Sequence, residues 1–179
     1  MMAGARTPRK RGVTQMATFD LILSGGEVVN QDGIGARDVG VRAGRIAEIG
    51  DLSRASAGER VECKGLTILP GVIDSQVHFR EPGATHKEDL ETGSRAAVMG
   101  GVTCVFEMPN TNPLTTSAET LADKVARGRK RMHCDFAFWV GGTHENVNDI
   151  PELERLPGAA GIKVFMGSST GSLLVADDK

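Results

Sequence analysis

The sequence lacks the features that mark membrane proteins and nucleic-acid-binding proteins. No apolar run approaches the ~20 residues that a membrane-spanning helix needs, so no membrane segment is predicted. Basic and acidic residues nearly balance, at 21 and 23, and the net charge is −2. Without an excess of positive charge, the sequence predicts neither a nucleic acid nor a membrane surface as a partner.

The N-terminus also lacks an apolar stretch long enough for the core of a secretory signal peptide. Residues 1–18 carry four basic side chains, and we expect them to form a disordered basic tail. Two alternatives stay open: a transit peptide, or a tail that precedes a true translation start at Met16.

Cysteine is scarce, with three residues and no Cys-x-x-Cys pair. The wide spacing of Cys63, Cys104 and Cys134 favours reduced thiols in the core of a cytoplasmic protein. A structural zinc site or a disulfide is the alternative.

Glycine, by contrast, is abundant, at 23 of 179 residues, and predicts many tight turns. Residues 19–68 contain short apolar runs and turn signals but no helical spacing. We expect two strands joined by a Gly-Gly turn over residues 19–29, a strand–turn–strand unit over 36–49, and an interrupted strand over 60–68. Together they predict a small β-module of antiparallel strands.

From residue 69 onward, strands alternate with helices. Ser117 or Thr116 can cap the second helix, on which Leu121 and Val125 share a face. The expected strands are 72–79, 102–107, 134–140 and 161–166, and the expected helices are 87–99, 116–130 and 150–156. This alternation predicts an α/β fold with a parallel sheet.

About four βα units fit into residues 69–179. A closed (β/α)₈ barrel of the TIM type needs eight units and typically ~250 residues. We therefore expect an incomplete barrel, its first half, in the front part of a larger protein.

A polar cluster follows the apolar run at residues 66–73. Asp74, Gln76, His78 and Arg80 stand within seven residues, at the expected end of a buried strand. Buried polar groups cost free energy unless they are paired, so such a cluster predicts a site. Gln76 and His78 are expected on one side of the strand and Val77 on the other.

Taken with Met108-Pro109-Asn110-Thr111 and with residues 161–165 (GIKVF), this cluster resembles dihydroorotases, which are metal-dependent cyclic amidohydrolases. The resemblance runs from about residue 19 to the end of the chain. It implies a (β/α)₈ barrel packed against a β-sandwich that both chain ends build. Residues 19–68 are then the N-terminal part of that sandwich.

The resemblance also implies roles for single residues. In the family pattern His-x-His-x-Arg, His78 matches the second metal-binding histidine, and Gln76 replaces the first. Arg80 matches the arginine that holds the substrate carboxylate, and Asn110 an asparagine that contacts substrate. Lys163 matches a lysine that some members carboxylate to bridge two zinc ions. The family's remaining metal-binding histidines and its catalytic aspartate are expected beyond residue 179, so no catalytic residue is assigned in this chain.

The chemistry agrees with these roles in part. A zinc pair activates water and polarises the amide carbonyl. A lysine ammonium has no lone pair for a metal, whereas a carboxylated lysine has two oxygens. The neutral amide oxygen of Gln76 suits calcium or magnesium better than zinc, so we expect Gln76 to reduce zinc affinity at this position. The guanidinium of Arg80 can bind a carboxylate with two hydrogen bonds.

Each assignment has a structural alternative. His78 could be a hydrogen-bonded histidine without a metal, and Arg80 an ion-pair partner of Glu81 or Asp74. Asn110 could set a turn, and Lys163 could be an unmodified lysine at the barrel mouth. The remaining histidines are expected at the surface: His86, His133 and His144. The run Gly167–Gly171 could bind phosphate but lacks a following lysine and helix pattern.

The leading hypothesis is a dihydroorotase-like enzyme of pyrimidine synthesis. It would interconvert N-carbamoyl-L-aspartate and dihydroorotate in the cytoplasm with metal-activated water, and the 179-residue chain alone would be inactive. The first alternative, which Gln76 motivates, is a catalytically impaired scaffold subunit, for example for aspartate carbamoyltransferase. The second is a hydantoinase or allantoinase relative. The expected partner is a small-molecule substrate, and a homo-oligomer stays open.

Overall fold

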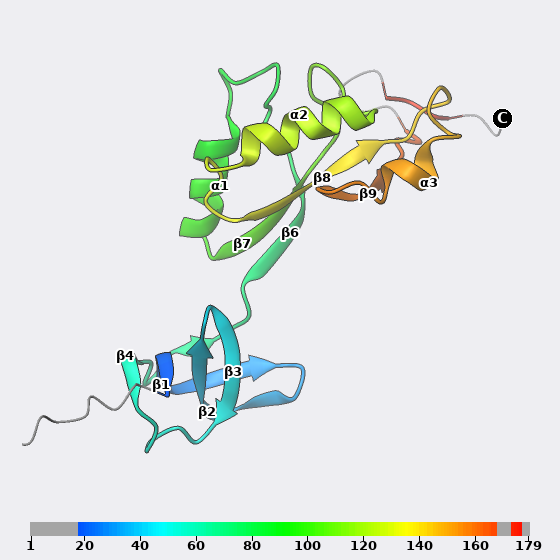
Figure 1. The fold of residues 1–179 in the computed structure, drawn as a ribbon. Helices are drawn as coiled ribbons and strands as arrows, with labels where there is room; N and C mark the ends of the chain where they lie inside the picture. The colour runs from blue at the N-terminus through cyan, green and yellow to red at the C-terminus, as the bar shows by residue number, and fades with distance from the viewer. Residues whose placement is uncertain (1–17, 168–172, 177–179) are drawn as a thin grey trace, which may run out of the picture. The chain divides into compact units, whose positions relative to one another are not determined.

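The computed structural model describes residues 18–167 and 173–176. The chain divides into two compact units, one up to Pro70 and one from Gly71 (Figure 1). Apart from Thr18, the predicted basic tail lies outside the described residues. No helix among the described residues is long and apolar enough to cross a membrane.

The first unit is a five-stranded sheet in which β1 (Phe19–Asn30) is central. Strand β2 (Gly33–Arg42) pairs antiparallel with β1, and β3 (Arg45–Gly50) pairs antiparallel with β2. On the other side of β1 lie β4 (Ala57–Glu62) and the short β5 (Thr67–Ile68). Phe19, Ile22 and Leu52 form the small core of this unit.

Two expectations for this unit are wrong. Residues 19–29 form one strand instead of two, because both halves of β1 pair with β2 and Gly25, at φ 73°, absorbs a bulge between Leu23 and Gly26. The strands are also not all antiparallel, since β4 and β5 run parallel to β1. The chain crosses back through a loop whose carbonyls at Leu52 and Ala55 accept hydrogen bonds from Arg60.

The turn predicted within residues 36–49 is confirmed. Ala43 and Gly44 join β2 to β3, with φ of 51° and 71°. Positive φ at both central residues is typical of a tight β-hairpin turn.

The second unit is a parallel sheet in the order β6-β7-β8-β9, which confirms the α/β prediction. Helix α1 packs on β7, α2 on β8 and α3 on β9 (Figure 1). The strands are β6 (Val72–Val77), β7 (Val102–Glu107), β8 (Asp135–Gly141) and β9 (Ala159–Lys163). The helices are α1 (Leu90–Met99), α2 (Ala118–Gly128) and α3 (Ile150–Leu153). Four parallel strands with helices between them are consistent with part of a barrel.

Helices α1 and α2 begin later than predicted because a polar residue caps each of them, whereas α3 begins at Ile150, as predicted. The side chain of Asp89 accepts a hydrogen bond from Thr92 N at the start of α1, at 2.8 Å. Ser117 does the same for Thr120 N at the start of α2, at 3.3 Å. Each cap satisfies a backbone N–H that the helix leaves without a partner.

The main core lies between the sheet and the three helices. Strand residues alternate between faces, and Phe138 and Val140 of β8 are buried in one cluster with helix residues such as Leu121. The aromatic rings of Phe106 and Trp139 stack edge to face, with centroids 6.2 Å apart. The indole of Trp139 also donates a hydrogen bond to the carbonyl of Ser75 on β6, at 2.9 Å.

Candidate functional site

The four predicted site residues lie at the carboxyl ends of the parallel strands. His78 and Arg80 follow β6, Asn110 follows β7 by three residues, and Lys163 ends β9. Parallel strands end at the same edge of a sheet, which is where α/β proteins place their sites. Strand β6 ends at Val77, two residues earlier than predicted, so His78 and Arg80 belong to a loop.

His78 interacts with each of the other three predicted site residues, through a hydrogen bond or through their charge. Its imidazole is hydrogen-bonded to the side chain of Asn110, and the charges of Arg80 and Lys163 act on it. Burial lowers the pKa of His78, Arg80 lowers it further, and the bond to Asn110 opposes them. The net shift is downward, so the imidazole is neutral at pH 7 and keeps a nitrogen lone pair.

The loops after β6 and β7 are joined to each other. Asn112 N donates a hydrogen bond to the carbonyl of Pro82, at 3.1 Å, and Met108 N donates one to Val77, at 3.0 Å. Gly83 has a φ of 106°, and a Cβ there would lie 2.7 Å from the carbonyl oxygen of Asn112. Only glycine fits both the backbone conformation and this contact.

Arg80 is half-buried and has a left-handed backbone, with a φ of 63°. The ion-pair alternative predicted for it is wrong. Within the part of the chain that the structure describes, Glu81 pairs with Arg131 and Arg127, and neither Glu81 nor Asp74 pairs with Arg80. The guanidinium of Arg80 therefore forms an ion pair with neither of these two carboxylates.

Glu81 has partners that the sequence did not reveal. Glu81 is 4% exposed, and its carboxylate accepts two hydrogen bonds from Arg131, at 2.8 and 3.2 Å. It also accepts one from Leu90 N, at 3.1 Å. Burial alone raises the pKa of Glu81, but the hydrogen bonds from Arg131 and Leu90 outweigh it, and the pKa lies below its usual value.

A second ion pair, in which both side chains are buried, lies beneath the Asn110 loop. Lys124 of α2 and Glu107 of β7 are each 1% exposed, with Nζ and Oε2 2.7 Å apart. The ammonium also donates to the carbonyl of Met108, at 3.3 Å, and lies 4.9 Å from the centroid of the Phe138 ring. Burial raises the pKa of Glu107 and lowers that of Lys124.

Sequence reasoning missed this second pair, although a signal for it was present. Leu121, Lys124 and Gly128 are the buried residues of α2, at the i, i+3, i+7 spacing of one helix face. A lysine on the apolar face of a helix needs a buried partner. Glu107, at the end of an apolar strand, was the available one.

Lys163 is half-buried at the end of β9. Its Nζ lies 5.2 Å from the centroid of the Phe165 ring, a distance at which an ammonium is attracted to an aromatic face. Its carbonyl accepts a hydrogen bond from Gly142 N, at 2.9 Å. Strand pairing and ring contact therefore hold this lysine beside the end of β8.

The metal-binding side chains among the described residues make up only part of a zinc site. A catalytic zinc takes three ligands from the protein, and no group of three or more His, Cys, Asp and Glu side chains among residues 18–167 and 173–176 could hold a metal. Gln76 is exposed, while Val77 packs against the core, as the alternation predicted. Among the described histidines at this edge, His78 is half-buried, whereas His144, three residues after β8, is exposed.

The other predicted features divide into two groups. The three remaining histidines are exposed, as expected: His86, His133 and His144. Most of the glycine-rich run Gly167–Gly171 lies outside the described residues, so the structure does not test it.

The chain matches known proteins along most of its length. Residues 65–158 match a family model described as Dihydro-orotase-like. The chain is 42% identical to an allantoinase of Rubrobacter xylanophilus over 165 residues, which is 91% of this chain and 36% of the relative. It is 36% identical to a dihydroorotase of Methanosarcina mazei over 160 residues, 89% of this chain and 35% of that protein.

Solved structures of hydantoinases share the fold of this chain. An L-hydantoinase (dihydropyrimidinase) from Arthrobacter aurescens superposes with a TM-score of 0.82 at 31% identity, covering 89% of this chain and 36% of the hydantoinase. A D-hydantoinase (dihydropyrimidinase) from a Thermus species has a TM-score of 0.71 at 26% identity, covering 88% of this chain and 35% of that structure. The chain thus spans about a third of the length of these relatives.

Proposed function

Because the chain belongs to the Dihydro-orotase-like family of cyclic amide hydrolases, we propose that the protein built with this chain hydrolyses a ring amide. Water adds across the amide C–N bond: the carbonyl carbon gains the hydroxyl, the nitrogen gains the proton, and the ring opens to a carboxylate. Because the chain spans about a third of its relatives, the activity is proposed for the full-length product of the gene.

The first substrate candidate is allantoin, whose five-membered ring contains amide-type C–N bonds. The observation that carries it is the 42% identity to the Rubrobacter allantoinase across 91% of this chain. The sequence-based hypothesis of dihydroorotate is the second candidate, and Arg80 favours it. A guanidinium that neither Glu81 nor Asp74 neutralises can bind the carboxylate of that ring with two parallel hydrogen bonds.

Two side chains would hold the substrate ring at the edge of the sheet, and a third would bind a metal ion. Arg80 would bind the charged or carbonyl end of the substrate, and Asn110 would exchange hydrogen bonds with a ring amide. The neutral imidazole of His78 would present its lone pair to a metal ion. The hydrogen bond to Asn110 would fix the orientation of this imidazole. Zinc, when bound, supplies a water with a lowered pKa, and Lys163 in a carboxylated form would be a second ligand.

The test compares three rings with the zinc-loaded full-length protein. We expect allantoin to be opened with a kcat/KM about a hundredfold above those for dihydroorotate and unsubstituted hydantoin, because leaving a buried polar group of the site without its partner costs up to about 3 kcal/mol. If dihydroorotate is preferred instead, the second candidate replaces the first. If no ring is opened, the enzymatic proposal fails.

The scaffold alternative is a second candidate function because Gln76 occupies a metal-histidine position. It requires a metal-free, inactive full-length protein, and it would bind a partner enzyme such as aspartate carbamoyltransferase. Metal analysis separates the two cases. A Gln76→His variant that gains zinc and ring-opening activity would locate the defect at this residue, whereas zinc and activity in the natural protein would exclude the scaffold.

A further inference from the structure

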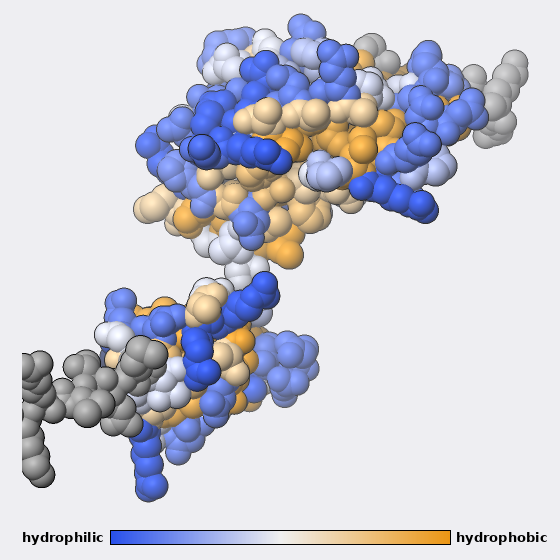
Figure 2. Space-filling model, in the orientation of Figure 1, coloured by the Kyte–Doolittle hydropathy of each residue, from blue (hydrophilic) through white to orange (hydrophobic). Residues whose placement is uncertain are grey.

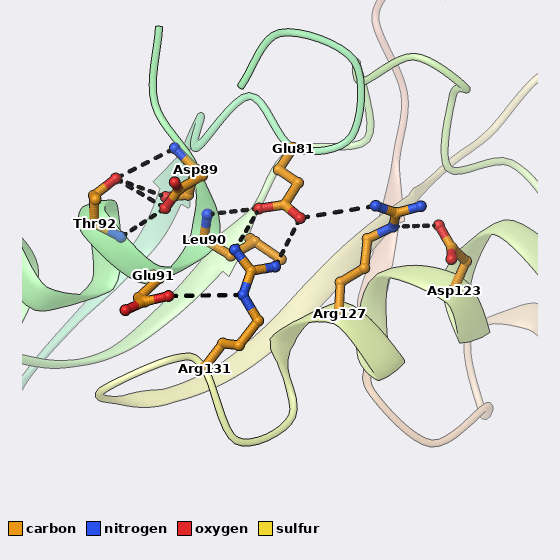
Figure 3. A network of polar contacts seen from close by, with 8 residues as sticks. All are labelled: Glu81, Asp89, Leu90, Glu91, Thr92, Asp123, Arg127 and Arg131. Carbon is orange, nitrogen blue, oxygen red and sulfur yellow. Dashed lines mark hydrogen bonds and ion pairs between the residues drawn. The ribbon is translucent and has the colours of Figure 1, made fainter. Parts of the chain in front are cut away.

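Glu81 is the residue that connects the Arg80 loop to two helices. Its buried carboxylate accepts a hydrogen bond from Leu90 N at the start of α1 and two from Arg131, just after α2. Figure 3 shows Arg131 reaching from Glu81 to Glu91. A planar guanidinium that binds a carboxylate through two nitrogens fixes its orientation as well as its distance.

Arg80 stands between two anchored neighbours. On one side, Phe79 is 7% exposed and packs its ring against Gly93 of α1, where a Cβ would lie 2.5 Å from the ring. On the other side, Glu81 is held as described. Arg80 itself has a φ of 63°, a left-handed conformation that non-glycine residues keep only where the surroundings determine it on both sides.

From these contacts we propose that Glu81 is a positioning residue for Arg80. It is held by Arg131 and Leu90, it fixes the left-handed turn at Arg80, and through that turn it sets where the Arg80 guanidinium meets the substrate. The inference rests on the proposed function, in which Arg80 binds the charged or carbonyl end of a ring. The positioning role would explain why the ion pair between Glu81 and Arg131 lies behind the site.

Two arginines face Glu81, and the geometry distinguishes their roles. Arg131 makes both short hydrogen bonds, whereas the Nη1 of Arg127 lies 3.8 Å from the carboxylate. Arg127 is instead bound to Asp123 of its own helix, at 2.7 Å (Figure 3). Arg131 is therefore expected to carry the effect, and Arg127 serves as the matched control.

The experiment is a double-mutant cycle in the full-length protein. We expect Glu81→Gln to raise the KM of the preferred ring by about tenfold, the lower end of effects for residues behind a site, with kcat nearly unchanged. In an Arg80→Ala background, the same substitution should change KM by less than about twofold, because Glu81 acts only through Arg80. An equal loss in both backgrounds would overturn the proposal, since Glu81 would then support the fold alone.

Variants of Arg131 and Arg127 test the two cationic partners of Glu81. Arg131→Gln should reproduce the rise in KM, and Arg131→Lys should restore part of the loss because it keeps the charge without the planar fork. Arg127→Gln should leave KM within about twofold of the parent, as expected for an exposed ion pair. If Glu81→Gln does not fold, the two Arg131 variants, crossed with Arg80→Ala, decide the question. An Arg131→Gln protein with unchanged KM would contradict the inference.

A ligand-free measurement separates this inference from the proposed function. Ala84 N donates a hydrogen bond to the carbonyl of Arg80, at 2.9 Å, so its hydrogen exchange reports on the turn. We expect faster exchange there in Glu81→Gln and Arg131→Gln, and no change in Arg127→Gln. If no ring is opened, the proposed function fails. Unchanged exchange at Ala84 would overturn the positioning role by itself.

Discussion

At the residue scale, the buried pair of Glu107 and Lys124 makes the sharpest stability prediction. Lys124→Met leaves the Glu107 carboxylate buried without its cation, at a cost of about 3–5 kcal/mol. The double variant Glu107→Leu with Lys124→Met removes both charges, and most of that loss should be recovered. Urea unfolding followed by the fluorescence of Trp139, the single tryptophan, measures both changes in the unit that contains the pair.

The control for this pair is Lys130→Met, which replaces an exposed lysine just beyond the same helix. It should shift the free energy of unfolding by no more than about 0.5 kcal/mol. A Lys124→Met variant as stable as this control would show that the buried carboxylate needs no cation.

Single residues also show how far the sequence could predict the site. His78, Arg80 and Asn110 follow strands and Lys163 ends one, so the alternation of strands and helices was enough to place them at one edge. The partners of Glu81 could not be predicted in the same way. Arg131 lies fifty residues further along the chain, and only the packing of α2 beside the Arg80 loop brings the two charges together.

At the scale of elements, helix α1 depends on a glycine in its buried face. Alanine in a helix interior is usually more stable than glycine by about 1 kcal/mol. At Gly93, however, a Cβ would lie 2.5 Å from the Phe79 ring, so we expect Gly93→Ala to destabilise the protein by about 1–3 kcal/mol through overpacking. Thermal or urea unfolding measures the change.

The matched substitution is Gly100→Ala at the end of the same helix. There the nearest atom to an added Cβ is the carbonyl oxygen of Ala97, at 3.4 Å. This variant should unfold within about 0.5 kcal/mol of the parent. Equal effects at both glycines would mean that the Phe79 ring moves aside without cost.

Elements were predicted best where local signals were strong. The capping residue Ser117 and the stop at Gly100 come from side chains and backbone next to the helix, so α2 and the end of α1 were found. Strand β1 was misread because a Gly-Gly pair signals a turn locally. Pairing with β2 along its whole length, which no local window contains, keeps it extended through a bulge.

At the scale of the whole molecule, the edge of the parallel sheet is apolar. Val72 and Ile73 of β6 are 51% and 61% exposed, and Figure 2 shows apolar surface in the region of the sheet. Exposed strand edges with apolar side chains template association with other chains. The 179-residue chain, by itself, should therefore associate as its concentration rises.

Ile73→Lys should weaken this association. Burying one isoleucine contributes about 1.5–3 kcal/mol, so the midpoint concentration should rise by about tenfold or more. Size-exclusion chromatography with light scattering measures it. Met99→Lys is the control, because Met99 is 84% exposed at the end of a helix rather than on a strand edge. A chain that stays monomeric, or one in which both variants act alike, would refute the prediction.

The joint between the two loops limits how this site can be re-engineered. The Asn112 amide donates a hydrogen bond to the carbonyl of Pro82, and Gly83 lies against Asn112. A change in the length of either loop would therefore break its contacts with the other loop. A transplant of substrate preference from a relative would therefore have to exchange both segments, residues 78–89 and 108–117, as one graft.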